Sequence, residues 1–236
     1  MRVGLLQCGR LPQDLVDDVG DYCRLFEALL GPHGVTIEAH DVVSGPPPAS
    51  AKSCDGWLVS GSAASTFDPL PWIAPTETFL RAVVAEQVPV VGICFGHQLL
   101  AQALGGRVAR APGGWGAGVH RYDLMGPPRP WMEPDPPRSI HLVASHRDQV
   151  VALPEGAEVL ARTEHCHVAA YTFGQHVLAI QPHPEYDATI SRSLSQSRRE
   201  LMGPEVTDQA LASLDAPLDS TMVGAWMAAF LLAGRS

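Results

Sequence analysis

The residues with the clearest chemical potential surround Cys94, in the stretch VVGICFGHQLL at residues 90–100. An apolar run ends at this cysteine and a run with helical spacing follows it, with Gly92 two positions before and Gly96 two positions after. Small residues there allow a sharp strand-to-helix turn that exposes the central side chain. The helix N-terminus favours a nucleophilic thiolate, and the Phe95 N–H would face a developing oxyanion. The pattern predicts a cysteine nucleophile, although a buried cysteine in a glycine-flanked turn has the same pattern.

A second candidate group follows an apolar run, in the sequence QPHPE at residues 181–185. Prolines on both sides of His183 exclude a helix. In an extended chain, residues two apart face the same side, so the Glu185 carboxylate can orient the His183 imidazole while its other nitrogen faces the thiol. With Cys94, this predicts a Cys-His-Glu triad, whose chain order differs from that of the α/β-hydrolases. A surface histidine in a proline turn is the alternative.

The elements that must position these groups alternate along the first half of the chain. Apolar runs predict strands over residues 2–8, 35–43, 55–60 and 88–94. Helical spacing predicts helices over residues 13–30 and 76–86. Near-continuous apolar strands between helices are typical of a sheet buried on both faces. We therefore expect an α/β fold with a doubly wound, mostly parallel sheet and a nucleophile elbow.

The second half of the chain differs from the first in composition and in its predicted elements. Residues 111–139 are rich in glycine and proline, so we expect irregular structure there and assign no role to it. Strands are predicted over residues 140–144, 158–161, 168–173 and 177–181, as hairpins that complete one edge of the sheet, and helices over 191–201 and 220–232. We expect a domain over residues 1–190 and a C-terminal helical extension over 191–236, packed on the same domain.

Composition excludes several classes of function. The 236 residues include 16 Lys and Arg against 25 Asp and Glu, a net charge of −9, which disfavours nucleic-acid binding. The sequence lacks a signal-peptide pattern and an uncharged apolar run of the roughly 20 residues that a bilayer requires, so we expect no membrane partner. Five irregularly spaced cysteines favour reduced thiols in a cytoplasmic protein.

Several ordered motifs resemble those of the class I (triad-type) glutamine amidotransferases, most closely the glutaminase domain of GMP synthase and its stand-alone relatives. The motifs lie at residues 59–62, 92–106, 145–150 and 183–185, and the resemblance spans roughly the first 190 residues. It implies a flavodoxin-like fold. It also implies that Cys94 is the nucleophile, that His183 acts as base and then as acid, and that Glu185 orients His183.

The same resemblance implies the remaining groups of the site and the reaction. The N–H groups of Gly61 and Phe95 correspond to the oxyanion hole, and Gln98, Ser145 and His146 fall where relatives hold the glutamine backbone. The implied reaction is hydrolysis of the glutamine side-chain amide, or of a similar γ-glutamyl amide, through a thioester on Cys94. It requires no cofactor and no metal, and a synthetase partner that receives the ammonia is an option.

The motifs do not identify the substrate. Residues 60–63 are Ser-Gly-Ser-Ala where many GMP synthases have Ser-Gly-Gly-Pro, a variant that resembles stand-alone members and the γ-glutamyl peptidases. The alternatives are therefore a γ-glutamyl peptidase, or a non-catalytic thiol sensor on the same fold, which the His-Glu pair disfavours. We expect too few residues after position 186 for a synthetase domain.

The remaining residues with reactive or metal-binding side chains are expected to have structural roles. His165, Cys166 and His167 fit no closed four-ligand zinc pattern, so we expect no metal. His97 is expected to be structural, since its side chain points back along its helix. Ordinary packing is expected for Trp115, Trp131 and Met132, and the alternative is an apolar patch for a homo-oligomer such as a dimer, or for another partner.

Overall fold

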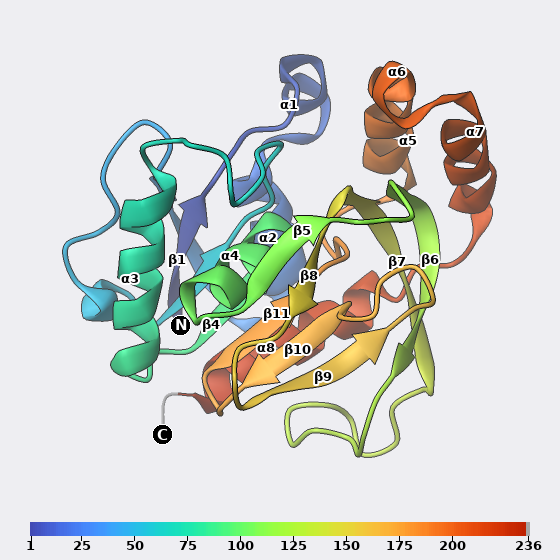
Figure 1. The fold of residues 1–236 in the computed structure, drawn as a ribbon. Helices are drawn as coiled ribbons and strands as arrows, with labels where there is room; N and C mark the ends of the chain where they lie inside the picture. Colours follow the sequence, from blue (N-terminus) through green and yellow to red (C-terminus); the bar gives the residue numbers. More distant parts are fainter. Residues whose placement is uncertain (235–236) are drawn as a thin grey trace.

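A nine-stranded sheet forms the centre of the protein in the computed structural model, which describes residues 1–234 (Figure 1). The strand order is β2-β1-β3-β4-β11-β10-β9-β6-β7, and the first five strands of this order are parallel. These five are β2 (Thr36–Asp41), β1 (Arg2–Gln7), β3 (Gly56–Val59), β4 (Val90–Ile93) and β11 (Val177–Ile180). The antiparallel strands are β10 (Ala170–Phe173), β9 (Ala157–Arg162), β6 (Gly116–Leu124) and β7 (Ser139–His146).

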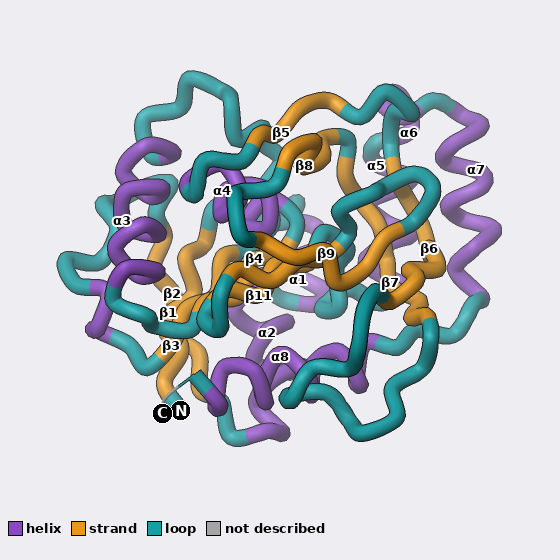
Figure 2. The backbone as a smooth tube through the Cα atoms, turned by 60° about the horizontal axis from the view of Figure 1, so that its bottom comes forward, coloured by secondary structure: helices purple, strands orange, loops and turns teal. Residues whose placement is uncertain are grey.

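The parallel half of the sheet is covered on both faces. Figure 2 shows α3 (Ile73–Ala85) and α4 (Phe95–Ala103) on one side of the strands, and α2 (Tyr22–Leu30) and α8 (Ser220–Ala233) on the other. Strands β3, β4 and β11 are buried at every position, because their side chains are apolar on both faces. Two hydrophobic clusters result, one on each face. The predicted doubly wound α/β fold is confirmed.

The remaining elements surround the antiparallel half. The predicted hairpins are present as the consecutive antiparallel strands β9, β10 and β11. A separate two-stranded sheet pairs β5 (Arg107–Arg110) with β8 (Asp148–Ala152), and helices α5 (Ala188–Ser197), α6 (Arg199–Met202) and α7 (Pro204–Ala212) lie beside β6 and β7 in Figure 1. The two small strands and α7 were not predicted.

The single helix predicted over residues 13–30 is wrong, because the structure has two helices there. Helix α1 (Gln13–Val19) ends at Gly20, whose φ of 86° lies outside the helical region. Asp21 then caps α2, with its side chain accepting a hydrogen bond from the Tyr22 N–H. The apolar spacing continues across the break, so periodicity by itself did not reveal it.

The irregular structure predicted over residues 111–139 is also partly wrong, since β6 occupies residues 116–124. Gly118 lies inside this strand with φ 81°, and a Cβ there would lie 2.7 Å from the Ala210 Cα in α7. The glycine permits close packing of helix on strand and does not mark a turn. Residues 125–138 contain no helix or strand.

The expected C-terminal extension packs into the same core as the sheet. Ile190, Leu194, Val223 and Phe230 share one hydrophobic cluster with Val3, which supports our proposal that these helices belong to the same domain. Residues 235 and 236, at the end of the expected extension, lie outside the described residues. Within residues 1–234, no single helix has the length and apolar composition to cross a membrane, although Pro204–Asp215 and Ser220–Ala233 qualify as a pair bent by 87°.

Candidate functional site

Cys94 sits at a strained turn between β4 and α4. Its backbone adopts φ 53° and ψ −100°, a region that non-glycine residues rarely occupy, and it is the N-cap residue of α4. A Cβ on Gly92 would lie 2.5 Å from the Gly96 carbonyl oxygen, and a Cβ on Gly96 would collide with the Val59 carbonyl. Both glycines are therefore required by close backbone approach, as the elbow pattern predicts.

His183 lies beside Cys94 because the strand that precedes it runs parallel to β4. Ile180 pairs with Ile93 in the sheet, so the residues that follow both strands emerge at the same edge. The backbone N–H of His183 donates to the Val143 carbonyl at 2.8 Å, which fixes the segment against β7. The imidazole Nδ1 lies 2.7 Å from Glu185 Oε1, and both side chains are almost fully buried.

The surroundings of His183 hold a proton on its ring. Burial by itself lowers the pKa of the imidazole, because it penalises the charged form. The negative charges of Glu185 and of an ionised Cys94, together with hydrogen bonds to both, outweigh burial and raise the pKa from 6.5 to about 10. The arrangement therefore stabilises the protonated form of the imidazole, between the side chains of Glu185 and Cys94.

Two tyrosines support the imidazole from the side. The Tyr186 ring stacks on the His183 ring with a centroid distance of 4.0 Å and an interplanar angle of 1°. The hydroxyl of Tyr186 is 2.9 Å from that of Tyr22, and both hydroxyls are buried. Burial raises the pKa of each phenol, so both stay protonated and the pair keeps its hydrogen bond. The stack restricts the tilt of the imidazole ring.

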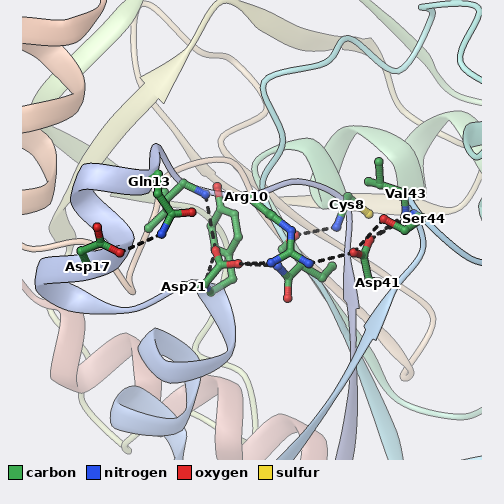
Figure 3. Close-up of polar contacts among 12 residues, drawn as sticks. Cys8, Arg10, Gln13, Asp17, Asp21, Asp41, Val43 and Ser44 are labelled. Carbon is green, nitrogen blue, oxygen red and sulfur yellow. Dashed lines mark hydrogen bonds and ion pairs between the residues drawn. The ribbon is translucent and has the colours of Figure 1, made fainter.

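A polar network holds the segment that carries Tyr22 (Figure 3). Arg10 lies between Asp21 and Asp41, with guanidinium-to-carboxylate distances of 3.7 and 2.9 Å. Burial raises the pKa of the Asp41 carboxyl, but hydrogen bonds from the side chains of Arg10 and Ser44 and from the backbone of Ser44 and Val43 outweigh burial and lower this pKa. The network connects the ends of β1 and β2 to the first turn of α2.

A cavity of about 160 Å³ opens in front of Cys94. Its walls are formed by residues that lie in or next to strands of both halves of the sheet and by residues of α2, α4 and α6. These are Tyr22, Ser62, Ala63, Ala64, Ser65, Cys94, Phe95, Gln98, Trp115, Ser145, His146, Arg147, Asp148, His183, Tyr186, Arg198 and Leu201. The lining therefore combines polar and charged side chains with one thiol, a combination that covalent catalysis can use.

The predicted oxyanion donors follow two neighbouring strands, β3 and β4. Phe95 is the first residue of α4, and the first N–H groups of a helix have no partner within it. Gly61 follows β3, and a Cβ there would come within 3.0 Å of His183 Cε1. The absence of a side chain at Gly61 thus leaves room for the imidazole beside a backbone amide.

Gln98, Ser145 and His146, predicted to hold the substrate, all line the cavity. The Gln98 amide is already engaged, since it donates to the Asp148 carbonyl at 2.8 Å and to Gln181 Oε1 at 3.0 Å. Burial lowers the pKa of His146 to about 3, so this ring is neutral, and its Nδ1 has no hydrogen-bond partner within residues 1–234. His146 can therefore offer a neutral hydrogen-bonding group.

Several residues of this site were not predicted from the sequence, among them Tyr22, Tyr186, Arg147 and Arg198. Tyr186 directly follows Glu185 in the chain, and that adjacency was the available signal. Arg198 comes from the end of α5, and its position in the cavity depends on how the C-terminal helices pack. No pattern in the sequence indicates this packing.

Among the other candidates, Trp115 was expected to be ordinary packing, but it lines the cavity, while the residues below do not. His97 is fully buried and packs on the Tyr171 ring at 5.0 Å, as expected for a structural residue. Cys166 is buried in the core, and the five cysteines are all free. Trp131 packs on Phe230. In the described part of the chain, one group brings three candidate metal ligands within 4.8 Å, formed by Glu38, His40 and Cys54.

Comparison with known proteins places this site in a family context. Residues 29–195 match the family described as glutamine amidotransferase class-I. The chain is 30% identical over 203 residues to gamma-glutamyl peptidase 5 of Arabidopsis thaliana, covering 83% of this chain and 81% of that protein. It is 33% identical over 175 residues to one of the subunits of the glutamine-hydrolysing GMP synthase of Halobacterium salinarum, covering 72% of this chain and 87% of that protein.

Solved structures show the same fold. A glutamine amidotransferase from Thermotoga maritima superposes with a TM-score of 0.77 at 16% identity, covering 100% of this chain and 97% of that one. A glutamine amidotransferase from Methylobacillus flagellatus superposes with a TM-score of 0.72 at 23% identity, covering 99% and 94%. At these identities the likeness concerns the architecture of the sheet and its helices.

Proposed function

The chain belongs to the class-I glutamine amidotransferase family, and we propose that it is a hydrolase that cleaves γ-glutamyl amide bonds with Cys94, His183 and Glu185. The observation that carries this proposal is the buried hydrogen bond of 2.7 Å between His183 and Glu185, because His183 lines the same cavity as Cys94. A thiol, a base and an orienting carboxylate are the parts that a cysteine amidase requires.

The proposed cycle has two stages. His183 takes the proton of Cys94, and the thiolate attacks the γ-carbonyl carbon, while the Gly61 and Phe95 N–H groups stabilise the oxyanion. His183 then protonates the departing amine, which leaves a γ-glutamyl thioester. Water, deprotonated by His183, hydrolyses the thioester and releases glutamate. The raised pKa of His183 supports its ability to hold a proton beside the thiolate.

We favour a γ-glutamyl peptide over free glutamine as the substrate. Relatives named as gamma-glutamyl peptidases 5 and 4 are 30% and 32% identical to this chain. Ser62 and Ala63 line the cavity where a glycine and a proline are found in many GMP synthases, so the wall beside the oxyanion donor has a different shape. The free thiols support a cytoplasmic location.

A second candidate function is a glutaminase that delivers ammonia to a separate synthetase. Its support is the likeness to the Halobacterium salinarum protein, whose name describes one of the subunits of a glutamine-hydrolysing synthase. On this alternative the protein would act with a partner, and free glutamine would be its substrate.

The test measures glutamate released from glutamine and from γ-glutamylglycine by the purified protein, with Cys94→Ala as the control. We expect a higher kcat/KM for the peptide and a loss on the order of 10⁶-fold in kcat for Cys94→Ala, as for other triad nucleophiles. Appreciable turnover by Cys94→Ala would contradict the mechanism. A preference for glutamine that a copurified synthetase increases would favour the second candidate.

A further inference from the structure

Two arginines and a tryptophan form a cationic cluster in the wall of the cavity. The Arg147 and Arg198 guanidinium carbons lie 5.6 and 5.9 Å from the centre of the Trp115 ring. All three side chains are half-buried and line the same cavity as Cys94. Arg198 also donates a hydrogen bond of 2.7 Å to the Ser145 hydroxyl. We refer to Trp115, Arg147 and Arg198 as the cationic cluster.

The positive charge of this cluster is not neutralised by the protein. Within residues 1–234, neither Arg147 nor Arg198 forms an ion pair, whereas the adjacent Arg199 pairs with Asp208 at 2.5 Å. The acid that lines the cavity, Asp148, already pairs with Arg110 at 3.6 Å and accepts a hydrogen bond from Ser65. Two like charges on one aromatic ring, without a counter-ion, are typical of a site that receives an anion.

The cluster is close enough to the reacting groups to act on the same molecule. Arg147 and Arg198 line the same cavity as Cys94, and so does Tyr22. Tyr22 contacts Tyr186, whose ring stacks on His183. A substrate whose carbonyl lies at Cys94 therefore occupies a cavity whose wall includes both arginines.

We propose that Trp115, Arg147 and Arg198 bind a carboxylate of the γ-glutamyl substrate, an inference that rests on the proposed function. A γ-glutamyl group carries an α-carboxylate, and a γ-glutamyl peptide carries a second carboxylate at its terminus. A guanidinium donates two parallel hydrogen bonds to such a group, which a lysine cannot reproduce. The cluster thus selects anionic γ-glutamyl substrates over neutral amides.

The experiment compares Arg198→Gln and Arg147→Gln with Arg199→Gln, a neighbouring arginine that pairs with Asp208 outside the cavity. Each variant is assayed with γ-glutamyl-p-nitroanilide, which has only the α-carboxylate, and with γ-glutamylglycine, which has both. Loss of a hydrogen bond between charged groups predicts a KM increase of about 10- to 100-fold for Arg198→Gln and Arg147→Gln. We expect little change for Arg199→Gln.

The two substrates identify the carboxylate. If KM increases with both substrates, the arginines bind the α-carboxylate. If KM increases only with γ-glutamylglycine, they bind the terminal carboxylate. KM values that match those of Arg199→Gln with both substrates would overturn the inference. Arg198→Lys serves if Arg198→Gln does not fold, and it should recover only part of the loss because it keeps the charge without the planar fork.

A binding measurement separates this inference from the proposed function. Calorimetry with γ-glutamylglycine in a Cys94→Ala background does not depend on turnover. If the wild-type protein releases no glutamate, the proposed function fails. The same titration still tests the cluster, since Arg198→Gln should weaken binding by about 10- to 100-fold. If turnover is normal and the dissociation constant is unchanged by both arginine variants, the inference alone is wrong.

Discussion

Replacement of Glu185 by glutamine tests how the carboxylate contributes to the site. The substitution keeps the shape of the side chain and removes its negative charge. In the wild-type protein, Glu185 Oε1 lies 2.7 Å from His183 Nδ1, and the Glu185 side chain has no solvent exposure. The imidazolium therefore loses a buried partner that water cannot replace.

The size of the effect follows from this burial. Removal of one member of a buried ion pair costs about 3–5 kcal/mol. If that cost falls on states that contain the imidazolium, kcat decreases by about 10²- to 10⁴-fold, at about 1.4 kcal/mol for each factor of ten. Burial, which lowers the pKa of His183, is then no longer opposed by the carboxylate, so this pKa falls from about 10. The alkaline limb of the pH–rate profile should move to lower pH.

The assay is glutamate release from γ-glutamylglycine across pH 5 to 11, for the wild type, Glu185→Gln, His183→Ala and Asp208→Asn. His183→Ala should lose more activity than Glu185→Gln, since it removes the proton carrier itself. Asp208→Asn breaks an exposed pair with Arg199 and should leave the profile unchanged. A folded Glu185→Gln enzyme with the wild-type kcat and alkaline limb would refute the reasoning.

Two further predictions concern the elbow and acid stability. Gly96→Ala, whose Cβ collides with β3, should displace Cys94 and reduce kcat by about 10²-fold, whereas Gly31→Ala, with open space around it, serves as the control and should keep wild-type kinetics. Burial lowers the pKa of His97 to about 3, so the unfolded chain binds an extra proton between pH 6.5 and 3. The unfolding free energy therefore has its full value above pH 6.5 and falls with acidification by up to about 1.4 kcal/mol per pH unit from this residue. Urea unfolding at pH 7 and 5 should show a smaller decrease for His97→Phe than for the wild type and the exposed control His167→Gln, and equal decreases would contradict the prediction.

The parallel half of the fold was predictable because its signals are local. Strands buried on both faces must be apolar along their whole length, as in residues 90–93 and 177–180, and the helices between them have their own spacing. Strand β6 was not predicted because Gly118 interrupts the strand pattern of the sequence. The glycine is needed at this position because the backbone of α7 packs closely against it. In a sequence, a glycine that forms a turn cannot be distinguished from one that allows close packing. The residues that contact it in the folded structure decide between the two roles.

The sequence by itself determined the elements of the centre: Cys94 between two glycines, and His183 two residues before Glu185 in extended chain. Residues that act within one turn or one short strand are constrained by local sterics, and spacing reveals these. The tertiary structure alone decided which distant groups surround them. Tyr22 contacts Tyr186, and Arg198 reaches the Trp115 ring that Arg147 also contacts, because the packing of α2 and α5 against the sheet brings these residues together. Such contacts depend on the free energy of burying whole helix faces, which no short stretch of sequence encodes.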